Sequence, residues 1–219
     1  MVSANGRLVI IREGRGEDGS VENLVVRTGK ELGVMPSPFW SIPPSPRYAI
    51  TTPEQAVRAA RIAATLNPSA ALLTADLEDS CPATAAPRFA DAVAKAGVGF
   101  PVAVLFFYRE YETLAISIAR SLGGSVLKSP TGQAIITLQS PQSVPSNPEQ
   151  LRDAKGWVER ELMGGVSYKP TVHQLPLTRA MKIAELRAAG LSSFRRLESA
   201  LTFLATEVRE GRAGIYPKA

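Results

Sequence analysis

Acidic side chains stand directly after apolar runs of this 219-residue chain, at Glu13, at Asp76 with Glu78 and Asp79, and at Glu110. Continuous apolar runs of this kind are typical of buried parallel strands, whose carboxyl ends meet at one edge of a sheet. Asp76 and Glu78 are two residues apart, so they point the same way along an extended chain. Carboxylates that are brought together repel each other, and a hard divalent cation relieves that repulsion. The pattern therefore predicts a Mg²⁺ or Mn²⁺ site suited to phosphodiester cleavage.

Most of these acids also have an ordinary structural explanation. Glu17, four residues after Glu13, shares a face with it if a helix starts early, but it could simply favour a helix N-terminus. Asp79 could cap the helix that follows it. Glu110 could pair with Arg109 on the surface. Both interpretations stay open on the residue pattern alone.

The elements that must position these acids alternate between strand and helix. Strands are predicted at 8–11, 70–75 and 101–107, and helices from the turn after Glu13 to Leu32, from Pro53 to Leu66, over 84–96 and up to Leu122. The second helix carries a capping box, with Thr52 as N-cap, Pro53 at N1 and Gln55 at N3. This alternation predicts an α/β fold with a mostly parallel sheet flanked by helices.

The remaining segments divide the chain. Five prolines within 35–47 indicate an irregular or edge segment. We expect an α/β core over 1–124, a loop or small subdomain over 125–147, and a helical extension over 148–219 that packs on the core. Within that extension, a helix is expected after Asn147 up to Leu162, and another from Ser192 or Ser193.

Composition narrows the functional classes. A single cysteine and a single histidine exclude a Cys/His zinc site within one chain, and an unpaired cysteine suits the reducing cytoplasm. No apolar run approaches the roughly 20 residues of a membrane-spanning helix, so no membrane association is expected. The formal net charge of +5 and a pI of about 9.6 suit a polyanionic partner such as nucleic acid.

Two stretches resemble the Toprim domain of topoisomerases, primases and the overcoming-lysogenization-defect (OLD) nucleases. They are 11–17, which contains Glu-Gly after a strand, and 75–82, which contains Asp-x-Glu after another strand. The chain further resembles a family of small, stand-alone, Toprim-like bacterial proteins, typically encoded beside ATPases in phage-defence loci. That resemblance rests on the order and spacing of short stretches at 79–82, 101–104, 109–112, 153–157, 168–174 and 193–197.

The resemblance implies roles for the acids. Glu13 would be the Toprim glutamate, acting as general acid or base or as a metal ligand. Asp76 and Glu78 would be the metal-binding pair, so these three residues would be the catalytic set. Glu17 would serve a second metal ion as in OLD-type nucleases, and Asp79 would be a further ligand.

It also implies additional site residues. One of Arg109, Glu110 and Glu112, which follow the next strand, would reach the site. Lys155 and Tyr168 would line the site or contact phosphate.

Three positions depart from the family pattern. Arg12 stands where the family has valine, and its charge would brace the site or lie against a phosphate. Glu78 replaces an aspartate and is a longer ligand, and His173 stands where an aspartate is expected.

The function implied is a Mg²⁺-dependent (or Mn²⁺-dependent) nuclease that acts on nucleic acid, with DNA favoured, in the cytoplasm. Family analogy implies control by a partner ATPase in an anti-phage defence system. The alternative is a catalytically weak or inactive Toprim-like module that binds or assembles a defence complex. Ligands for two metal ions about 4 Å apart would favour hydrolysis, and dispersed acids would favour the alternative.

Overall fold

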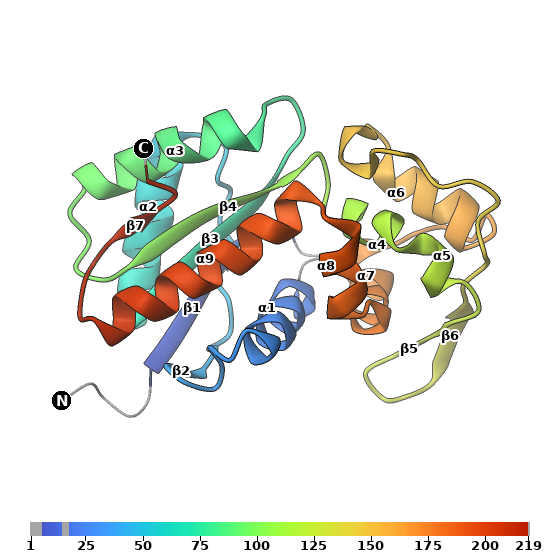
Figure 1. Cartoon of the computed structure of the whole chain (residues 1–219), viewed down its shortest axis with the longest axis horizontal. Helices are drawn as coiled ribbons and strands as arrows, with labels where there is room; N and C mark the ends of the chain where they lie inside the picture. The colour runs from blue at the N-terminus through green and yellow to red at the C-terminus, as the bar shows by residue number, and fades with distance from the viewer. Residues whose placement is uncertain (1–5, 15–17, 219) are drawn as a thin grey trace.

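The computed structural model describes residues 6–14 and 18–218 of the chain, and Figure 1 shows its elements in order. The main sheet has five strands in the order β2-β1-β3-β4-β7, and every neighbouring pair is parallel. Its strands are β1 (Gly6–Arg12), β2 (Phe39–Ser41), β3 (Ala70–Leu77), β4 (Val102–Tyr108) and β7 (Ile215–Tyr216). A separate antiparallel pair is formed by β5 (Val126–Lys128) and β6 (Ala134–Thr137). The predicted α/β class with a mostly parallel sheet is confirmed.

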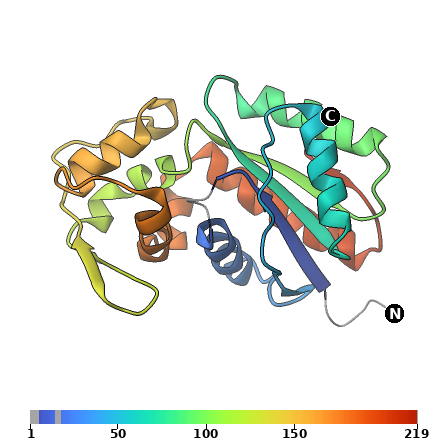
Figure 2. The same ribbon diagram turned by 180° about the vertical axis from the view of Figure 1, so that it is seen from behind.

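Helices cover both faces of the main sheet, as Figures 1 and 2 show from opposite sides. One face carries α2 (Pro53–Ala64) and α3 (Pro82–Lys95), and the other carries α1 (Ser20–Glu31) and α9 (Ser192–Arg209). The remaining helices lie beside the sheet and close to the β5–β6 hairpin. They are α4 (Thr113–Ser117), α5 (Ala119–Leu122), α6 (Ala154–Trp157), α7 (Pro170–Ala180) and α8 (Ile183–Ala189), with the 3₁₀ turn η1 (Pro148–Gln150) and the π-helical turn η2 (Val158–Leu162). We call these shorter helices the helical lobe.

The continuous apolar runs form strands because both of their faces are buried. Leu72 of β3 packs with α1 and α9, whereas its neighbour Leu73 packs with α2 and α3. Both side chains are fully buried. A strand with helices on both faces has no solvent-facing side, so its sequence lacks the usual polar alternation. The same packing fixes the register and holds the carboxyl ends of β1, β3 and β4 at one edge.

The helix ends follow the signals in the sequence. The Thr52 hydroxyl accepts a hydrogen bond from the Gln55 backbone N–H at 3.3 Å, and Gln55 Oε1 accepts one from the Thr52 N–H at 3.0 Å. This is the predicted capping box at the start of α2. Helix α1 ends just before Gly33, whose φ of +68° is readily adopted by glycine. The proline-rich segment contributes β2 at the sheet edge, as expected of a chain that lacks several N–H donors.

The helix expected after Asn147 is not continuous, and the prediction there was wrong. The chain forms η1, leaves it, and starts α6 at Asp153, whose side chain accepts from the Gly156 N–H at 3.0 Å. Glu149 turns instead to the N-terminus of α9, where its carboxylate accepts from the backbone N–H groups of Ser192 at 3.1 Å and Ser193 at 2.7 Å. Because the Glu149 carboxylate accepts its hydrogen bonds from another helix, it does not stabilise a helix in its own segment.

The C-terminal segment contributes more to the sheet than an extension packed on a core. Helix α9 lies against β4 and β3, and Ile215 pairs beside Val102 to add the last parallel strand. The range 148–219 therefore supplies both part of the helical lobe and a layer of the α/β core. No helix within 6–14 and 18–218 is long and apolar enough to span a membrane.

Candidate metal-binding pocket

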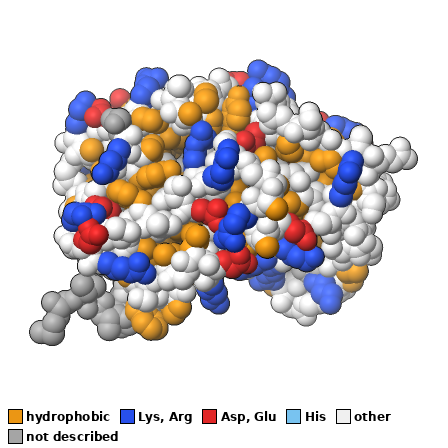
Figure 3. All heavy atoms as spheres, viewed as in Figure 1, with side chains coloured by type: hydrophobic (Ala, Val, Ile, Leu, Met, Phe, Trp, Pro, Cys, Tyr) orange, Lys and Arg blue, Asp and Glu red, His pale blue; other side chains and the backbone are white. Residues whose placement is uncertain are grey.

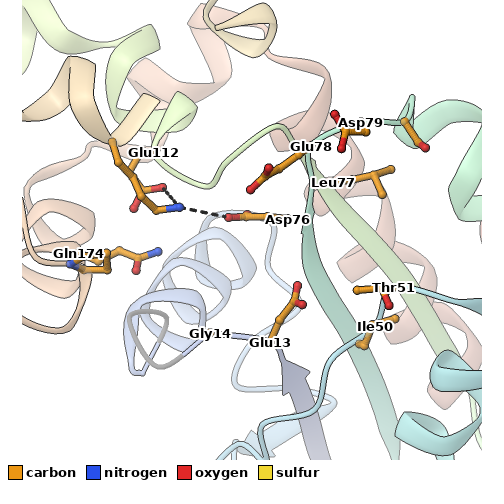
Figure 4. A pocket seen from close by; sticks show the side chains of 13 residues that line it. Glu13, Gly14, Ile50, Thr51, Asp76, Leu77, Glu78, Asp79, Glu112 and Gln174 are labelled. Atoms are coloured by element: carbon orange, nitrogen blue, oxygen red, sulfur yellow. Dashed lines mark ion pairs between the residues drawn. The ribbon is translucent and has the colours of Figure 1, made fainter. Parts of the chain in front are cut away.

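A pocket of about 520 Å³ opens at the carboxyl ends of β1 and β3. Glu13, Asp76 and Glu78 line it from the sheet, and Glu112 and Lys155 line it from the helical lobe. Figure 4 shows Glu13 and Glu78 extending toward Asp76, with Glu112 facing them across the pocket. The three acids that were predicted as the catalytic set therefore share one cavity.

The strand register explains why these acids meet. Arg12, the last residue of β1, is paired with Thr74 of β3, so Glu13 follows the end of β1 beside the part of β3 that continues to Asp76. Strand β3 runs two residues further than its apolar run and ends at Leu77. Asp76 is therefore held by strand pairing to Phe107 of β4. A side chain fixed on a central strand is better positioned than one on a loop.

Burial and charge both act on Glu13. Its side chain is half-buried, and desolvation raises its carboxyl pKa above the ordinary value; the nearby charge of Glu78 raises the pKa further. Two carboxylates that oppose each other's ionisation lie within electrostatic reach of each other. The raised pKa of Glu13 thus reflects its burial first and the negative charge of Glu78 second.

Lys155 places an ammonium group among three carboxylates. Its Nζ lies 3.9 Å from Oδ2 of Asp76 and 3.8 Å from Oε2 of both Glu110 and Glu112. Burial acts to lower the Lys155 pKa, but the charges of Glu112, Asp76 and Glu110 outweigh it and raise the pKa. The backbone N–H of Lys155 also donates to Glu110 Oε2 at 2.9 Å, which anchors the start of α6 to the end of β4. Lysine thus supplies a built-in cation on one side of the pocket.

Glu112 is the most deeply buried acid of the group, with an exposed fraction of 1%. The Tyr168 hydroxyl donates to its Oε1 at 2.9 Å, and Lys155 is its ion-pair partner. Burial raises the pKa of Glu112, although Lys155 and Tyr168 act in the opposite direction. Burial and the charge of Glu112 together raise the Tyr168 pKa well above its usual value. Tyr168 therefore acts as a hydrogen-bond donor that holds Glu112 in place.

The carboxylates face a common space without converging on one point. Across residues 6–14 and 18–218, no group of three or more His, Cys, Asp or Glu side chains is gathered closely enough to enclose a metal ion. The donor set of Glu13, Asp76 and Glu78 consists of carboxylate oxygens, which are the ligands that Mg²⁺ and Mn²⁺ prefer. These residues therefore fit a hard divalent cation in chemistry, and side-chain rotation would have to complete the coordination.

Asp79 lines the pocket, whereas Arg109, which was also predicted for the site, does not. Asp79 is 85% exposed and lies 3.5 Å from Nη1 of Arg152. It does not cap α3, because the N-cap residue is Cys81 and the cap has no side-chain hydrogen bond. Arg109 adopts a left-handed φ of +67° and donates to the backbone carbonyl of Glu78. Arg109 therefore braces the β3 end through the backbone, and Glu110 pairs with Lys155 rather than with it.

The structure places Arg12 outside the pocket. Its side chain is buried, donates from Nε to Glu22 at 3.2 Å and from Nη1 to the Gly14 carbonyl at 3.1 Å, and forms an ion pair with Asp18. Of the two expected roles, these contacts match a brace between β1 and α1. The predicted ligand Glu17 lies outside the described residues.

Sequence reasoning missed Gln174 and Thr51, which also line the pocket. Gln174 is buried in α7, which has no clear apolar stripe that would have shown which face turns inward. The neighbouring His173 does not line the pocket. Its Nδ1 accepts from the Lys169 N–H at 2.9 Å, and its ring lies 5.8 Å from the Tyr168 ring, so it fixes the start of α7.

The chain was compared with protein families, curated proteins and solved structures. No protein-family model matches the chain, and no curated protein matches it. A crystal structure of Drosophila Piwi superposes with a TM-score of 0.36 and 16% sequence identity, over 59% of this chain and 21% of that one. The chain thus spans about a fifth of the length of that protein. A likeness at this level carries no argument about function, and the pocket must be interpreted from its own residues.

Proposed function

We propose that this protein is a metal-dependent phosphodiester hydrolase that acts on nucleic acid, with Mg²⁺ or Mn²⁺ held by Glu13, Asp76 and Glu78. The observation that carries the proposal is that these three carboxylates, from the ends of two adjacent parallel strands, line one cavity. The carboxyl edge of a parallel sheet is where α/β proteins bind ligands. The raised pKa of Glu13, caused by burial and by Glu78, adds a sign of concentrated negative charge.

A bound divalent ion would supply an activated water and charge stabilisation at phosphate oxygens. The residues of the chain would do the rest. Glu13 would hold the ion or act as general acid or base, the two roles that the Toprim resemblance implies. Lys155 is suited to turn its ammonium group from the carboxylates to a substrate phosphate. Glu112, fixed by Tyr168, keeps Lys155 at the mouth of the pocket.

The resemblance to Toprim-like proteins supports the same assignment. It concerns the same positions, Glu13 with Gly14 and Asp76 with Glu78, that line the pocket. We extend the proposal to membership of the Toprim-like family, to a cytoplasmic location and to control by a partner ATPase in phage defence, on that resemblance alone.

The second candidate is a binding or assembly module without catalysis. Two observations favour it. Among the described residues the acids are not gathered closely enough to enclose a metal ion, and the ammonium group of Lys155 already pairs with Asp76, Glu110 and Glu112. In that case the acids would need no metal ion, and the pocket would serve to join the helical lobe to the sheet.

The test is a Mg²⁺ and Mn²⁺ titration by calorimetry, followed by incubation of the same samples with plasmid DNA. The Glu13→Gln/Asp76→Asn variant removes two charges from the pocket. A Glu54→Gln/Asp91→Asn variant makes the same chemical changes on α2 and α3, outside the pocket, as a matched control. The proposal expects the pocket variant alone to lose both metal binding and cleavage while keeping its thermal unfolding transition.

The other outcomes separate the candidates. Metal binding that is lost in the pocket variant, without any cleavage by the wild type, would favour the assembly module or a partner-gated enzyme. Wild-type protein that binds neither ion would overturn the metal-site proposal. Cleavage that survives in the pocket variant would mean that the reaction occurs elsewhere or comes from a contaminant.

A further inference from the structure

A second, larger groove of about 910 Å³ runs between α1, the proline-rich segment around β2, and the end of α7. Among the described residues, none lines both this groove and the acidic pocket. The two cavities are nonetheless adjacent. Glu13 and Gln174 line the acidic pocket, and their chain neighbours Arg12 and Leu175 line the groove. We call this groove the β2 groove. Arg12 lines it, but Glu13, Asp76, Glu78 and Asp79 do not.

The β2 groove exposes a large aromatic side chain. Trp40 is 56% exposed, whereas Phe39 before it on the same strand is fully buried. Phe39 anchors β2 in the core, so Trp40 is held outward on a short edge strand flanked by prolines. An indole ring presented on a rigid support offers a flat apolar face at little cost in side-chain entropy. Figure 3 shows hydrophobic side chains gathered at the lower edge of the molecule, over the β2 region.

The same groove carries surplus positive charge. Lys30, Arg47 and Arg179 line it and are exposed. Among the residues that the structure describes, no carboxylate lies within ion-pair distance of these three side chains. The acids in the groove, Asp18 and Glu22, are instead paired with Arg12. The groove therefore combines an exposed ring with cations that are not paired with any acid in the part of the chain that the structure describes.

We propose that the β2 groove binds single-stranded nucleic acid, with a base stacked on Trp40 and the backbone phosphates on Lys30, Arg47 and Arg179. An exposed ring can stack only on an unpaired base, which favours a single strand over a duplex. The carboxylates of the acidic pocket repel phosphate, so the energy that holds a strand there must come from neighbouring cations. The proposal rests on the proposed function, since the groove would deliver the strand to the adjacent catalytic pocket.

Tryptophan fluorescence offers a direct test, because the chain has two tryptophans. Trp157 is 7% exposed, so a Trp157→Phe variant leaves Trp40 as the reporter on the surface. The variant is titrated with oligothymidylate of about 12 nucleotides in EDTA, a length within the range of known single-strand sites. We expect the Trp40 emission to be quenched on binding. A log–log slope of affinity against salt of about −2 is expected for three phosphate contacts on a single strand.

Variants in the wild-type background guard against loss of folding in the reporter. Anisotropy of a labelled oligothymidylate should show about 5- to 150-fold weaker binding by Trp40→Ala, the range expected from loss of one stacked base. Lys30→Ala and Arg179→Ala should each weaken binding and flatten the salt slope. Arg195→Ala removes an exposed cation of α9 outside the groove and should leave affinity unchanged.

The outcomes also separate this inference from the proposed function. Oligonucleotide binding in EDTA without any metal-dependent cleavage would support the groove and count against the nuclease. Cleavage of bis(p-nitrophenyl) phosphate by a protein that does not bind the oligonucleotide would support the hydrolase and overturn the groove. Equal affinity of wild type and Trp40→Ala for oligothymidylate would also overturn the groove proposal. So would tighter binding of a DNA duplex than of the single strand, or quenching of Trp40 by the acidic polypeptide polyglutamate but not by oligothymidylate.

Discussion

Replacement of Lys155 by methionine tests how the acidic pocket balances its charge. Methionine keeps most of the length of the side chain and removes only the ammonium group. In the structure that group lies 3.8–3.9 Å from oxygens of Asp76, Glu110 and Glu112. If these carboxylates also attract a divalent ion, lysine and metal compete for the same negative charge. We expect Lys155→Met to bind Mn²⁺ more tightly than the wild type.

The distances set the size of the effect. One pair of unit charges about 4 Å apart interacts by roughly 1 kcal/mol in water and roughly 4 kcal/mol at an effective dielectric constant of about 20. The lower figure applies here, because the Lys155 side chain is 40% exposed. A divalent ion at a similar distance would be repelled by the ammonium group by about twice that, or roughly 2 kcal/mol. Removal of the lysine should therefore lower the Kd for Mn²⁺ by about 10- to 100-fold.

The assay is calorimetric titration with Mn²⁺ at constant ionic strength, with Lys128→Met as the control. Lys128 is an exposed lysine on β5, so its replacement changes the net charge equally without touching the pocket. Without metal, Lys155→Met should be less stable by about 1–2 kcal/mol, because the buried Glu112 loses its cation; this corresponds to about 2–8 °C in Tm. Mn²⁺ should restore that loss. Unchanged or weaker Mn²⁺ affinity in Lys155→Met would refute the reasoning. An equal rise in Mn²⁺ affinity in Lys128→Met would show that the effect comes from net charge alone.

Two further changes test the framework that supports the site. Glu149→Gln should destabilise the fold by about 1–2 kcal/mol at neutral pH in urea unfolding, because the carboxylate accepts hydrogen bonds from the two serines that begin α9. Burial acts to raise the Glu149 pKa, but those hydrogen bonds outweigh it and lower the pKa. The stabilisation of the fold by ionised Glu149 is thus fully present above the unfolded pKa of about 4.3 and is lost as pH falls through the lower folded pKa. The free energy of unfolding of Glu149→Gln should lack this loss at acid pH. Arg12→Met should lower the free energy of unfolding by about 2–4 kcal/mol, because it leaves the half-buried Glu22 without its cation. The Mn²⁺ affinity of the folded protein should be unchanged. A stable Arg12→Met protein with altered Mn²⁺ affinity would contradict the role of Arg12 as a brace.

Local patterns in the sequence were enough to predict the α/β class and the acids at the strand ends. Apolar runs such as 70–75 predict central strands because only a strand covered on both faces is apolar throughout. The Thr52 capping box places the start of α2 because its hydrogen bonds join residues three apart. Glu13 and Asp76 could be predicted as neighbours because parallel strands bring their carboxyl ends to the same edge.

Other features depended on contacts between distant parts of the chain. Glu149 caps α9 instead of continuing a helix after Asn147, and no local signal distinguishes these two uses of a glutamate. The two-residue strand β7 forms because β4 offers a free edge beside Ile215. Such a short segment has no periodicity to detect, so its pairing depends on the partner strand.

The sequence by itself determined which carboxylates follow the strands, because the tendency to form a strand or a helix is encoded within each segment. Only the tertiary structure decided that Lys155 enters the same pocket, that Glu112 is buried beneath it, and that Arg12 turns away from it. These side chains come from segments whose relative positions are set by the packing of the helical lobe on α1 and by the hydrogen bond between α6 and Glu110 after β4. The balance of charge in the pocket is therefore a property of the fold, because electrostatic interactions depend on distance and burial rather than on position along the chain.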